Sequence, residues 1–242
     1  RNFYSVDSRS VPTPAAWKLG WKSAGLLIER HFQDHGEYPK RIALSAWGTA
    51  NMRTGGDDIA QALALMGVQP EWDKQSGRVI GYEVMPAGVL GRPRVDVVFR
   101  VSGFFRDAFP AQVELLDQAA RAVAALSEAA DINPLAAQVA EDAAALAAGG
   151  LDMETARKKA GYRVFGSKPG AYGAGLQTLI DEKCWDGDAD LARAYVAWGG
   201  YAYGAGAEGQ AEQSLFEARL MGAQVVVHNQ DNREHDLLDS DD

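Results

Sequence analysis

The sequence contains only one cysteine, Cys184, among its 242 residues. A single cysteine excludes an internal disulfide and any cysteine-rich metal site, and it suits a cytoplasmic protein. Basic residues are also few, because 24 Lys and Arg stand against 33 Asp and Glu and give a net charge of −9. We therefore expect no nucleic-acid partner, since a phosphate backbone requires a basic face. No apolar run reaches about 18 residues, the length that indicates a membrane span, so no membrane partner is expected either.

Hydrophobic residues make up 47% of the chain, enough for a sizeable core in one large domain or two small ones. Strands are predicted at residues 40–47, 94–102 and 225–227, and predicted helices separate them. That order favours parallel strands joined by helical crossovers. The three valines at 225–227 suit a strand buried on both faces. The sequence therefore predicts an α/β fold, with a mainly parallel sheet flanked by helices, and leaves the strand order open.

The first predicted helix covers residues 14–35. Thr13 is suited to cap its amino end, and Pro14 to occupy its first position. The residues expected on its buried face are Trp17, Trp21, Ala24 and Ile28.

An alanine-rich helical insertion is predicted at residues 108–161, where Asn133 and Pro134 begin its second helix. Small side chains permit close helix contacts but carry little chemistry. The whole chain is predicted to form one structural unit. An α/β part at 1–107 precedes the insertion, and a final part at 162–242 follows it. The final part holds a glycine-rich loop, helices and the last strand.

Glycine-containing loops are predicted at residues 48–56, 103–107 and 163–175. Side chains in loops beyond the carboxyl ends of parallel strands are candidates for ligand binding. Phosphate binding by the first loop is not favoured, because Asp57 and Asp58 occupy the positive end of the next helix and no Gly-Lys-Ser/Thr pattern follows. The last residue of the second loop is expected to cap the following helix. An ordinary tight turn is an equal alternative for that loop.

Gly204, Gly206 and Gly209 match the pattern Gly-x-Gly-x-x-Gly. The pattern alone would indicate a dinucleotide site and a nucleotide-dependent oxidoreductase. We do not favour that function, because residues 198–203 contain two glycines and make a poor strand before the pattern. The last helix is expected over residues 208–220.

A dense set of donor side chains follows the third predicted strand. Residues 228–242 contain two imidazoles and six carboxylates, a mixture that suits borderline divalent metals. A solvated acidic tail is the open alternative, since runs of like charge near a terminus usually are solvated. The preceding valine strand, together with Leu237 and Leu238 within the polar run, favours a metal or acid–base site.

Several long stretches of this chain resemble one family. The segment HNQDNREHDLLDSDD resembles a signature of the large subunit of the aerobic cobaltochelatase, a relative of the magnesium-chelatase H subunit. The stretches RNFYSVDSRSVPTPAAWKLGW, SAWGTANMRTGGDDIAQALALMGVQPEW, GRPRVDVVFRVSGFFRDAFPAQVELLD and RVFGSKPGAYGAG agree with it. The resemblance covers nearly all of the chain and implies an internal or C-terminal-half fragment of a much larger protein.

The resemblance implies a tetrapyrrole-binding subunit that inserts Co²⁺, its metal substrate, into a corrin precursor, hydrogenobyrinic acid a,c-diamide, in aerobic cobalamin biosynthesis. It also implies two partners, an AAA+-type ATPase subunit that uses ATP and Mg²⁺ and its metal-site-containing companion subunit. Activity would require these partners, which agrees with the lack of a P-loop pattern in the sequence. Two alternatives stay open, a magnesium-chelatase-like subunit acting on a porphyrin and a non-catalytic metal-binding or assembly module.

Metal insertion must strip water from a cation and remove protons from ring nitrogens, tasks that suit imidazole and carboxylate groups. We expect His228, Glu234 and His235 to relay the metal and act as bases. Asp231 would orient them, and Asp239 is a further candidate metal ligand. Arginines are suitable clamps for the carboxylates of a corrin precursor, and aromatic side chains suit its ring face. The candidate ring-binding residues are Arg53, Arg100, Arg106, Arg233, Trp47, Phe104 and Tyr172.

Overall fold

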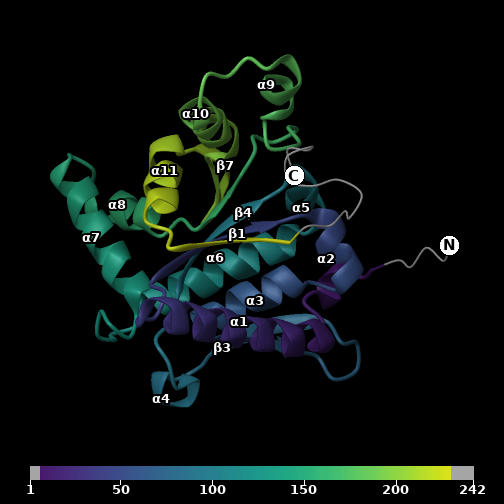
Figure 1. The fold of residues 1–242 in the computed structure, drawn as a ribbon. Helices are drawn as coiled ribbons and strands as arrows, with labels where there is room; N and C mark the ends of the chain where they lie inside the picture. The colour runs from purple at the N-terminus through teal and green to yellow at the C-terminus, as the bar shows by residue number, and fades with distance from the viewer. Residues whose placement is uncertain (1–5, 230–242) are drawn as a thin grey trace.

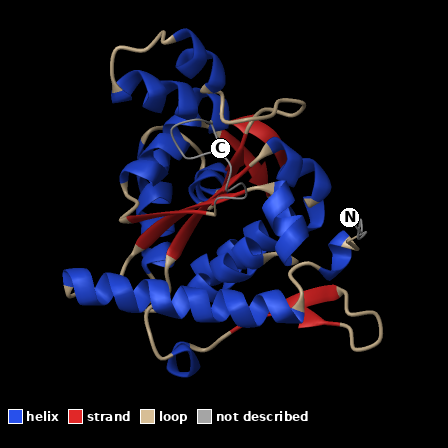
Figure 2. Cartoon of the chain, turned by 45° about the vertical axis from the view of Figure 1, so that its right-hand side comes forward, coloured by secondary structure: helices blue, strands red, loops and turns tan. Residues whose placement is uncertain are grey.

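A computed structural model describes residues 6–229, and residues 1–5 and 230–242 lie outside the described part. A six-stranded sheet runs between two layers of helices (Figures 1 and 2). Four neighbouring strands are parallel, and two further strands at one edge are antiparallel. The predicted α/β fold with a mainly parallel sheet is therefore confirmed. In spatial order the strands are β7 (Ala207–Ala211), β6 (Tyr201–Gly204), β5 (Val164–Gly166), β4 (Asp96–Val101), β1 (Arg41–Ala46) and β8 (Val225–His228).

Helices cover both faces of this sheet. The helical elements are η1 (Ser8–Ser10), α1 (Pro14–His35), α2 (Gly48–Thr54), α3 (Asp57–Met66), α4 (Ala87–Leu90), α5 (Gly103–Ala108), α6 (Pro110–Ala124), α7 (Pro134–Ala148), α8 (Met153–Ala160), α9 (Gln177–Glu182), α10 (Asp188–Gly199) and α11 (Gln213–Met221). On one face, α3 and α6 pack on the sheet and α1 packs outside α3 (Figure 1). On the other face lie α10 and α11. A separate antiparallel hairpin consists of β2 (Val68–Trp72) and β3 (Val79–Val84).

Strand β4 lies inside the sheet, and all six of its residues are buried although two of them, Asp96 and Arg100, are charged. Val97 and Phe99 belong to the larger core cluster, with α3 and α6. Val98 belongs to the smaller cluster, with Phe216 of α11. Because helices cover both faces, even Asp96 and Arg100 of this strand are buried.

Helix α1 has the predicted bounds and cap, since the Thr13 hydroxyl oxygen accepts a hydrogen bond from the Ala16 amide at 3.1 Å. Its predicted buried face is only partly right, because Trp21 is 38% exposed. Gly20 lies on the face toward α3, where an added Cβ would meet the Cβ of Ala60 at 2.5 Å. Such a close helix contact leaves room only for small residues there, so the tryptophan lies outside it.

Two predicted loops are short helices instead. Residues 48–56 contain α2, and residues 103–107 fall within α5. Ser102 caps α5, because its hydroxyl oxygen accepts the Phe105 amide hydrogen bond at 3.1 Å; Asp107 is therefore not a cap. Burial explains the helical turn, since Phe105 is fully buried in the main core while Phe104 is exposed.

The glycine pattern after residue 203 forms a hairpin. Residues 198–203 were expected to make a poor strand, but β6 hydrogen-bonds to β5 on one side and β7 on the other. The helix expected over 208–220 begins only at Gln213, after β7. Gly204 and Gly206 have φ angles of 101° and 79° at the turn, which glycine adopts readily. A hairpin here excludes the strand–turn–helix that a dinucleotide site requires.

Strand β8 occupies an edge of the sheet, beside β1. Val225 and Val227 pack against the main core, but Val226 is 71% exposed. The expectation of a strand buried on both faces is therefore wrong for this chain, because helices do not cover the outer face of this edge in the described residues.

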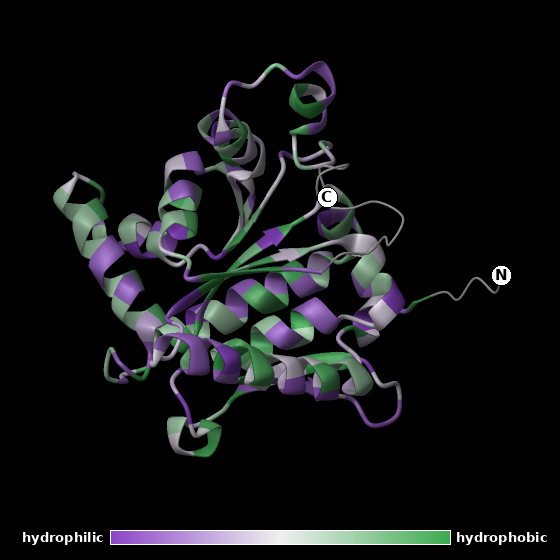
Figure 3. Cartoon of the chain, in the orientation of Figure 1, coloured by the Kyte–Doolittle hydropathy of each residue, from purple (hydrophilic) through white to green (hydrophobic). Residues whose placement is uncertain are grey.

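The alanine-rich region contains helices with different surroundings. Helix α6 contributes Val113, Leu116 and Val123 to the main core. Helix α7 buries only Leu135 and Ala143 and projects from the body (Figure 1), and apolar residues run along most of it (Figure 3). The domain boundaries at 107 and 161 stay a prediction. Among the described residues, no helix has the length and apolar character needed to cross a membrane.

A buried ion network joins three strands near their amino ends. Asp96 of β4 accepts hydrogen bonds from Nε of Arg41 at 2.9 Å and from Nε of Arg163 at 2.5 Å. Burial alone would raise the pKa of the Asp96 carboxyl, but the two arginines outweigh it and hold this pKa below its ordinary value. The network fixes β1, β4 and the start of β5 relative to one another.

Candidate functional site

The candidate site lies at the carboxyl ends of the parallel strands. His228 of β8 and Arg100 of β4 both pair with Ser45 of β1, from opposite sides. Residues paired across a sheet point to the same face, so both side chains lie on one side of it. Trp47 follows two residues after Ser45, and its ring contacts both side chains. The fold thus brings together three of the candidate residues from distant parts of the sequence.

Arg100 is 3% exposed and stacked between two aromatic rings. Its guanidinium carbon lies 5.6 Å from the Trp47 ring centre and 5.4 Å from the Tyr195 ring centre, distances typical of cation–π contacts. Its Nη2 donates a hydrogen bond to the Gly173 carbonyl oxygen at 3.1 Å. These contacts favour a role in holding the Trp47 ring, and direct binding of a ligand carboxylate by Arg100 stays a prediction.

His228 lies edge-on to Trp47, with ring centres 6.2 Å apart and an interplanar angle of 75°. Both side chains are half-buried. An imidazole titrates near neutral pH and binds metals through either ring nitrogen. This pair therefore places a nitrogen base beside an aromatic surface at the end of the sheet.

The other predicted donors lie outside the described residues. These residues are Asp231, Glu234, His235 and Asp239, together with Arg233 from the predicted ring-binding set. Within residues 6–229, no group of three His, Cys, Asp or Glu side chains could hold a metal ion. The metal-binding and catalytic assignments of the donor stretch therefore stay predictions.

Arg106 is bound to the protein itself. Its Nε and Nη2 donate to the two carboxylate oxygens of Asp107, at 2.7 and 3.0 Å. Its Nη1 donates to the carbonyl oxygens of Ser167, Lys168 and Ala171. The Arg106 guanidinium also lowers the pKa of Asp107. These contacts fix the loop after β5, and the predicted clamp for a ligand carboxylate would require some of them to break.

Two exposed aromatic rings lie beside the same strand ends. Phe104 is 40% exposed and Tyr172 is 59% exposed. Phe104 approaches Gly48 so closely that an added Cβ there would lie 2.5 Å from the phenyl ring. The Tyr172 hydroxyl donates to Oδ2 of Asp107 at 2.7 Å. Exposed aromatic rings suit the face of a planar ligand, and the predicted ring contacts of Trp47, Phe104 and Tyr172 stay a prediction.

Acidic side chains adjoin the end of β8 from the other side. A pocket of about 450 Å³ between α1, α3 and β8 is lined by Asp57, Asp58 and His228. Burial raises the pKa of Asp57, and the nearby charge of Arg53 only partly opposes this. Arg53 itself is exposed near the end of α2. Sequence reasoning assigned these aspartates only to a helix end, because no local pattern shows that His228 lies beside them.

Tyr195 was also missed, and Gly173 was covered only by the predicted loop at residues 163–175. Tyr195 stacks on Arg100, and the Gly173 carbonyl accepts hydrogen bonds from both Arg100 and the Trp198 indole. Tyr195 lies in a mostly apolar helix without a recognisable motif. Only the packing of α10 against the sheet brings this tyrosine to the site.

Comparisons with known proteins agree with this fold. The sequence model of the family described as CobN/Magnesium Chelatase matches residues 1–242. The chain is 65% identical to the aerobic cobaltochelatase subunit CobN of Sinorhizobium sp and 57% identical to that of Pseudomonas aeruginosa. Each match covers 100% of this chain and 19% of the relative. The catalytic subunit of cobaltochelatase from Mycobacterium tuberculosis matches with a TM-score of 0.90 and 49% identity, over 98% of this chain and 20% of that chain.

The chain thus spans about one fifth of the length of these relatives. The resemblance found in the sequence is confirmed by the family match over the whole chain and by the shared fold. This chain belongs to the CobN/Magnesium Chelatase family.

Proposed function

We propose that this chain forms part of the tetrapyrrole-binding, metal-inserting subunit of a cobalt chelatase. The observation that carries the proposal is the group of His228, Trp47 and Arg100 at the carboxyl edge of the sheet. It sets a nitrogen base beside an aromatic surface held by a buried cation. The names of the relatives, a cobaltochelatase subunit and a catalytic subunit of cobaltochelatase, support the same function.

The proposed reaction inserts Co²⁺ into hydrogenobyrinic acid a,c-diamide in aerobic cobalamin biosynthesis. Insertion exchanges water on the metal for ring nitrogens and releases ring protons to a base. His228 would accept such a proton or hold the incoming metal. Glu234, His235, Asp231 and Asp239 remain the other proposed donors.

The proposed energy source is ATP, hydrolysed with Mg²⁺ by a separate AAA+-type subunit that acts with a metal-site-containing companion. The sequence supports this division because it contains no P-loop pattern. We also propose a cytoplasmic location, which rests on the cysteine content.

The test uses the full-length subunit that contains this chain, mixed with its ATPase partners. We expect Co²⁺ insertion into the corrin precursor, dependent on ATP and on both partners, and none with the subunit alone. The family description also names magnesium chelatase, so Mg²⁺ with a porphyrin is the second substrate pair to assay. Preferred insertion of Mg²⁺ into the porphyrin would contradict the cobalt proposal. Metal binding that ignores every tetrapyrrole would instead indicate a metal-binding or assembly module.

A further inference from the structure

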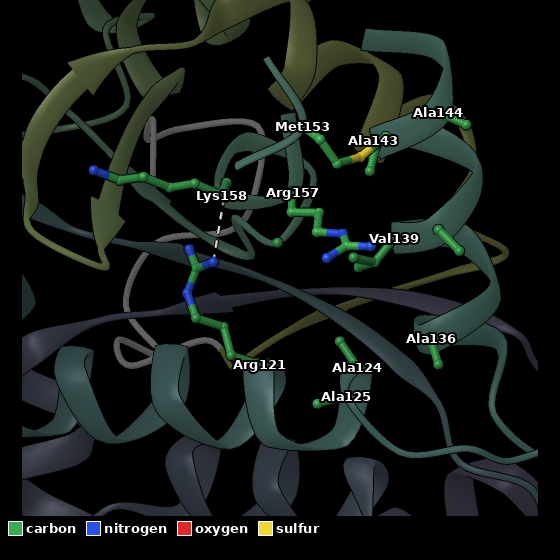
Figure 4. Close-up of a pocket in the computed structure, with 12 residues that line it drawn as sticks. Arg121, Ala124, Ala125, Ala136, Val139, Ala143, Ala144, Met153, Arg157 and Lys158 are labelled. Atoms are coloured by element: carbon green, nitrogen blue, oxygen red, sulfur yellow. Dashed lines mark hydrogen bonds between the residues drawn. The ribbon is translucent and has the colours of Figure 1, made fainter. Parts of the chain in front are cut away.

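A pocket of about 610 Å³ lies between α6, α7 and α8 (Figure 4). It adjoins the amino end of the sheet, because the Arg94 amide, two residues before β4, donates to the Ile132 carbonyl oxygen in the segment between α6 and α7. The candidate site lies at the opposite end of the strands. The pocket is therefore a second feature, independent of the proposed chelatase chemistry.

The walls of this pocket are mostly small and apolar. Ala124 comes from α6, Ala136, Val139 and Ala143 come from α7, and Met153, which is 47% exposed, comes from α8. Alanine side chains let a neighbouring backbone approach closely and leave room for large apolar side chains. A volume of this size holds several such side chains.

Two guanidinium groups line the pocket, and that of Arg157 gives it a positive charge. Figure 4 shows the Arg157 side chain extending toward Val139 across the pocket, whereas the Lys158 ammonium points away. The Arg157 side chain makes no hydrogen bond or ion pair with another residue of the described part of the chain. Arg121 uses Nε for Asp117 and Nη1 for the Lys158 carbonyl, but its Nη2 is buried without a hydrogen-bond partner in the described residues.

Arg121 is already paired with Asp117, but the lining residues include no carboxylate that could neutralise Arg157. The chain as a whole carries a net charge of −9, so this local excess of positive charge is unusual for it. A partner that fits must therefore combine bulky apolar side chains with carboxylates near them.

We propose that this pocket docks an apolar, carboxylate-bearing segment supplied by the remaining length of the family protein. About four fifths of the length of the relatives lies outside the region matched here. Helix α7 projects from the body and buries only two of its residues, so its apolar side has space for such a segment. Docking would pair Arg157 with a carboxylate, offer a hydrogen-bond acceptor to Nη2 of Arg121 and cover the alanine walls.

The test uses the full-length protein with a photocrosslinking phenylalanine derivative in place of Ala144, an exposed residue that lines the pocket. The matched control carries the same group in place of Ala145, which is also exposed but does not line it. We expect the probe at residue 144 to link to one acidic, apolar segment of the same polypeptide outside these 242 residues. We expect little of that product from residue 145. Thermal melts confirm that both variants remain folded.

The charge requirement has its own measurement. Arg157→Glu should lower the yield of the Ala144 crosslink about tenfold, the factor that corresponds to one charge-assisted hydrogen bond. Arg157→Lys should retain part of the yield, and Lys74→Glu, at an exposed turn between β2 and β3, should not change it. Crosslinking to a second copy, to an ATPase partner or to no protein would overturn the proposal. An unchanged yield in Arg157→Glu would overturn it as well.

Discussion

The two ends of the parallel sheet differ in how their charged side chains are used. At the amino end, Asp96 is closed between Arg41 and Arg163, and all three are buried. At the carboxyl end, His228 and Trp47 are half-buried and adjoin a pocket and exposed rings. A closed ion network holds strands together but offers nothing to a ligand, because its donors and acceptors are already used. The carboxyl end instead carries partly covered groups, at the position where ligands usually bind in parallel α/β sheets.

The strongest test of this difference is His228→Gln in the full-length subunit with its partners. We expect the insertion rate to fall by about 10²–10⁴, the usual contribution of an acid–base group. The melting temperature should stay close to that of the unmodified protein, since His228 ends an edge strand. Val226→Thr, on the exposed side of the same strand, is the matched control and should keep its rate. A loss of stability in proportion to the rate would identify His228 as a structural residue.

At the amino end, Asp96→Ala should have the opposite profile. It leaves Arg41 and Arg163 buried without their shared carboxylate, which costs about 3–5 kcal/mol of unfolding free energy. We expect a large decrease in melting temperature, with near-normal insertion by the molecules that remain folded. A variant that melts normally but no longer inserts metal would place a functional group at this end and abolish the distinction.

The same network predicts how stability depends on pH. The pKa of Asp96 is lower in the folded chain than in the unfolded chain. Its contribution is therefore present above the unfolded pKa of about 3.9 and is lost as the pH falls through the folded value. Asp96→Asn should be less stable at neutral pH and show a shallower acid transition, measured by circular dichroism between pH 7 and 2. Parallel acid transitions of the two proteins would contradict the assigned pKa.

Replacing Arg106 is expected to have a smaller effect than replacing His228 or Asp96. Its contacts predict that Arg106→Ala destabilises the loop at residues 167–172 by about 1.5–3 kcal/mol, the range for hydrogen bonds to charged groups. Protease sensitivity of that loop should rise, and Arg106→Lys should restore part of the protection because one charge remains without the planar fork. If Arg106→Ala weakened corrin binding without raising the protease sensitivity of the loop, the result would instead support Arg106 as a clamp for a ring carboxylate.

The smallest effect is expected from Trp47→Leu. This variant loses the cation–π contact with Arg100, worth about 0.5–2 kcal/mol, and the edge contact with His228. We expect a modest rise in KM for the corrin and a small decrease in melting temperature. Trp185→Leu, at an exposed position, is the control that should change neither quantity. Equal behaviour of the two variants would remove Trp47 from the site.

Local signals in the sequence were sufficient for several elements. The Thr13–Pro14 and Asn133–Pro134 pairs fix the starts of α1 and α7, and both caps form as predicted. These signals work because a cap and its helix are only a few residues apart. The short helices α2 and α5 were predicted as loops, since they depend on core contacts such as that of Phe105 rather than on a local pattern.

The sequence by itself determined the family, the mainly parallel α/β sheet and the residues with suitable chemistry. Only the tertiary structure decided which of them meet. The common pairing of His228 and Arg100 with Ser45 comes from the order of β8, β1 and β4, which no local propensity encodes. Tertiary packing also decided that Arg106 bonds to Asp107 and to the loop after β5. It likewise decided that the glycine pattern at residues 204–209 forms a hairpin. Pairing across a sheet joins residues that are distant in the chain, so its outcome depends on the packing of the whole core.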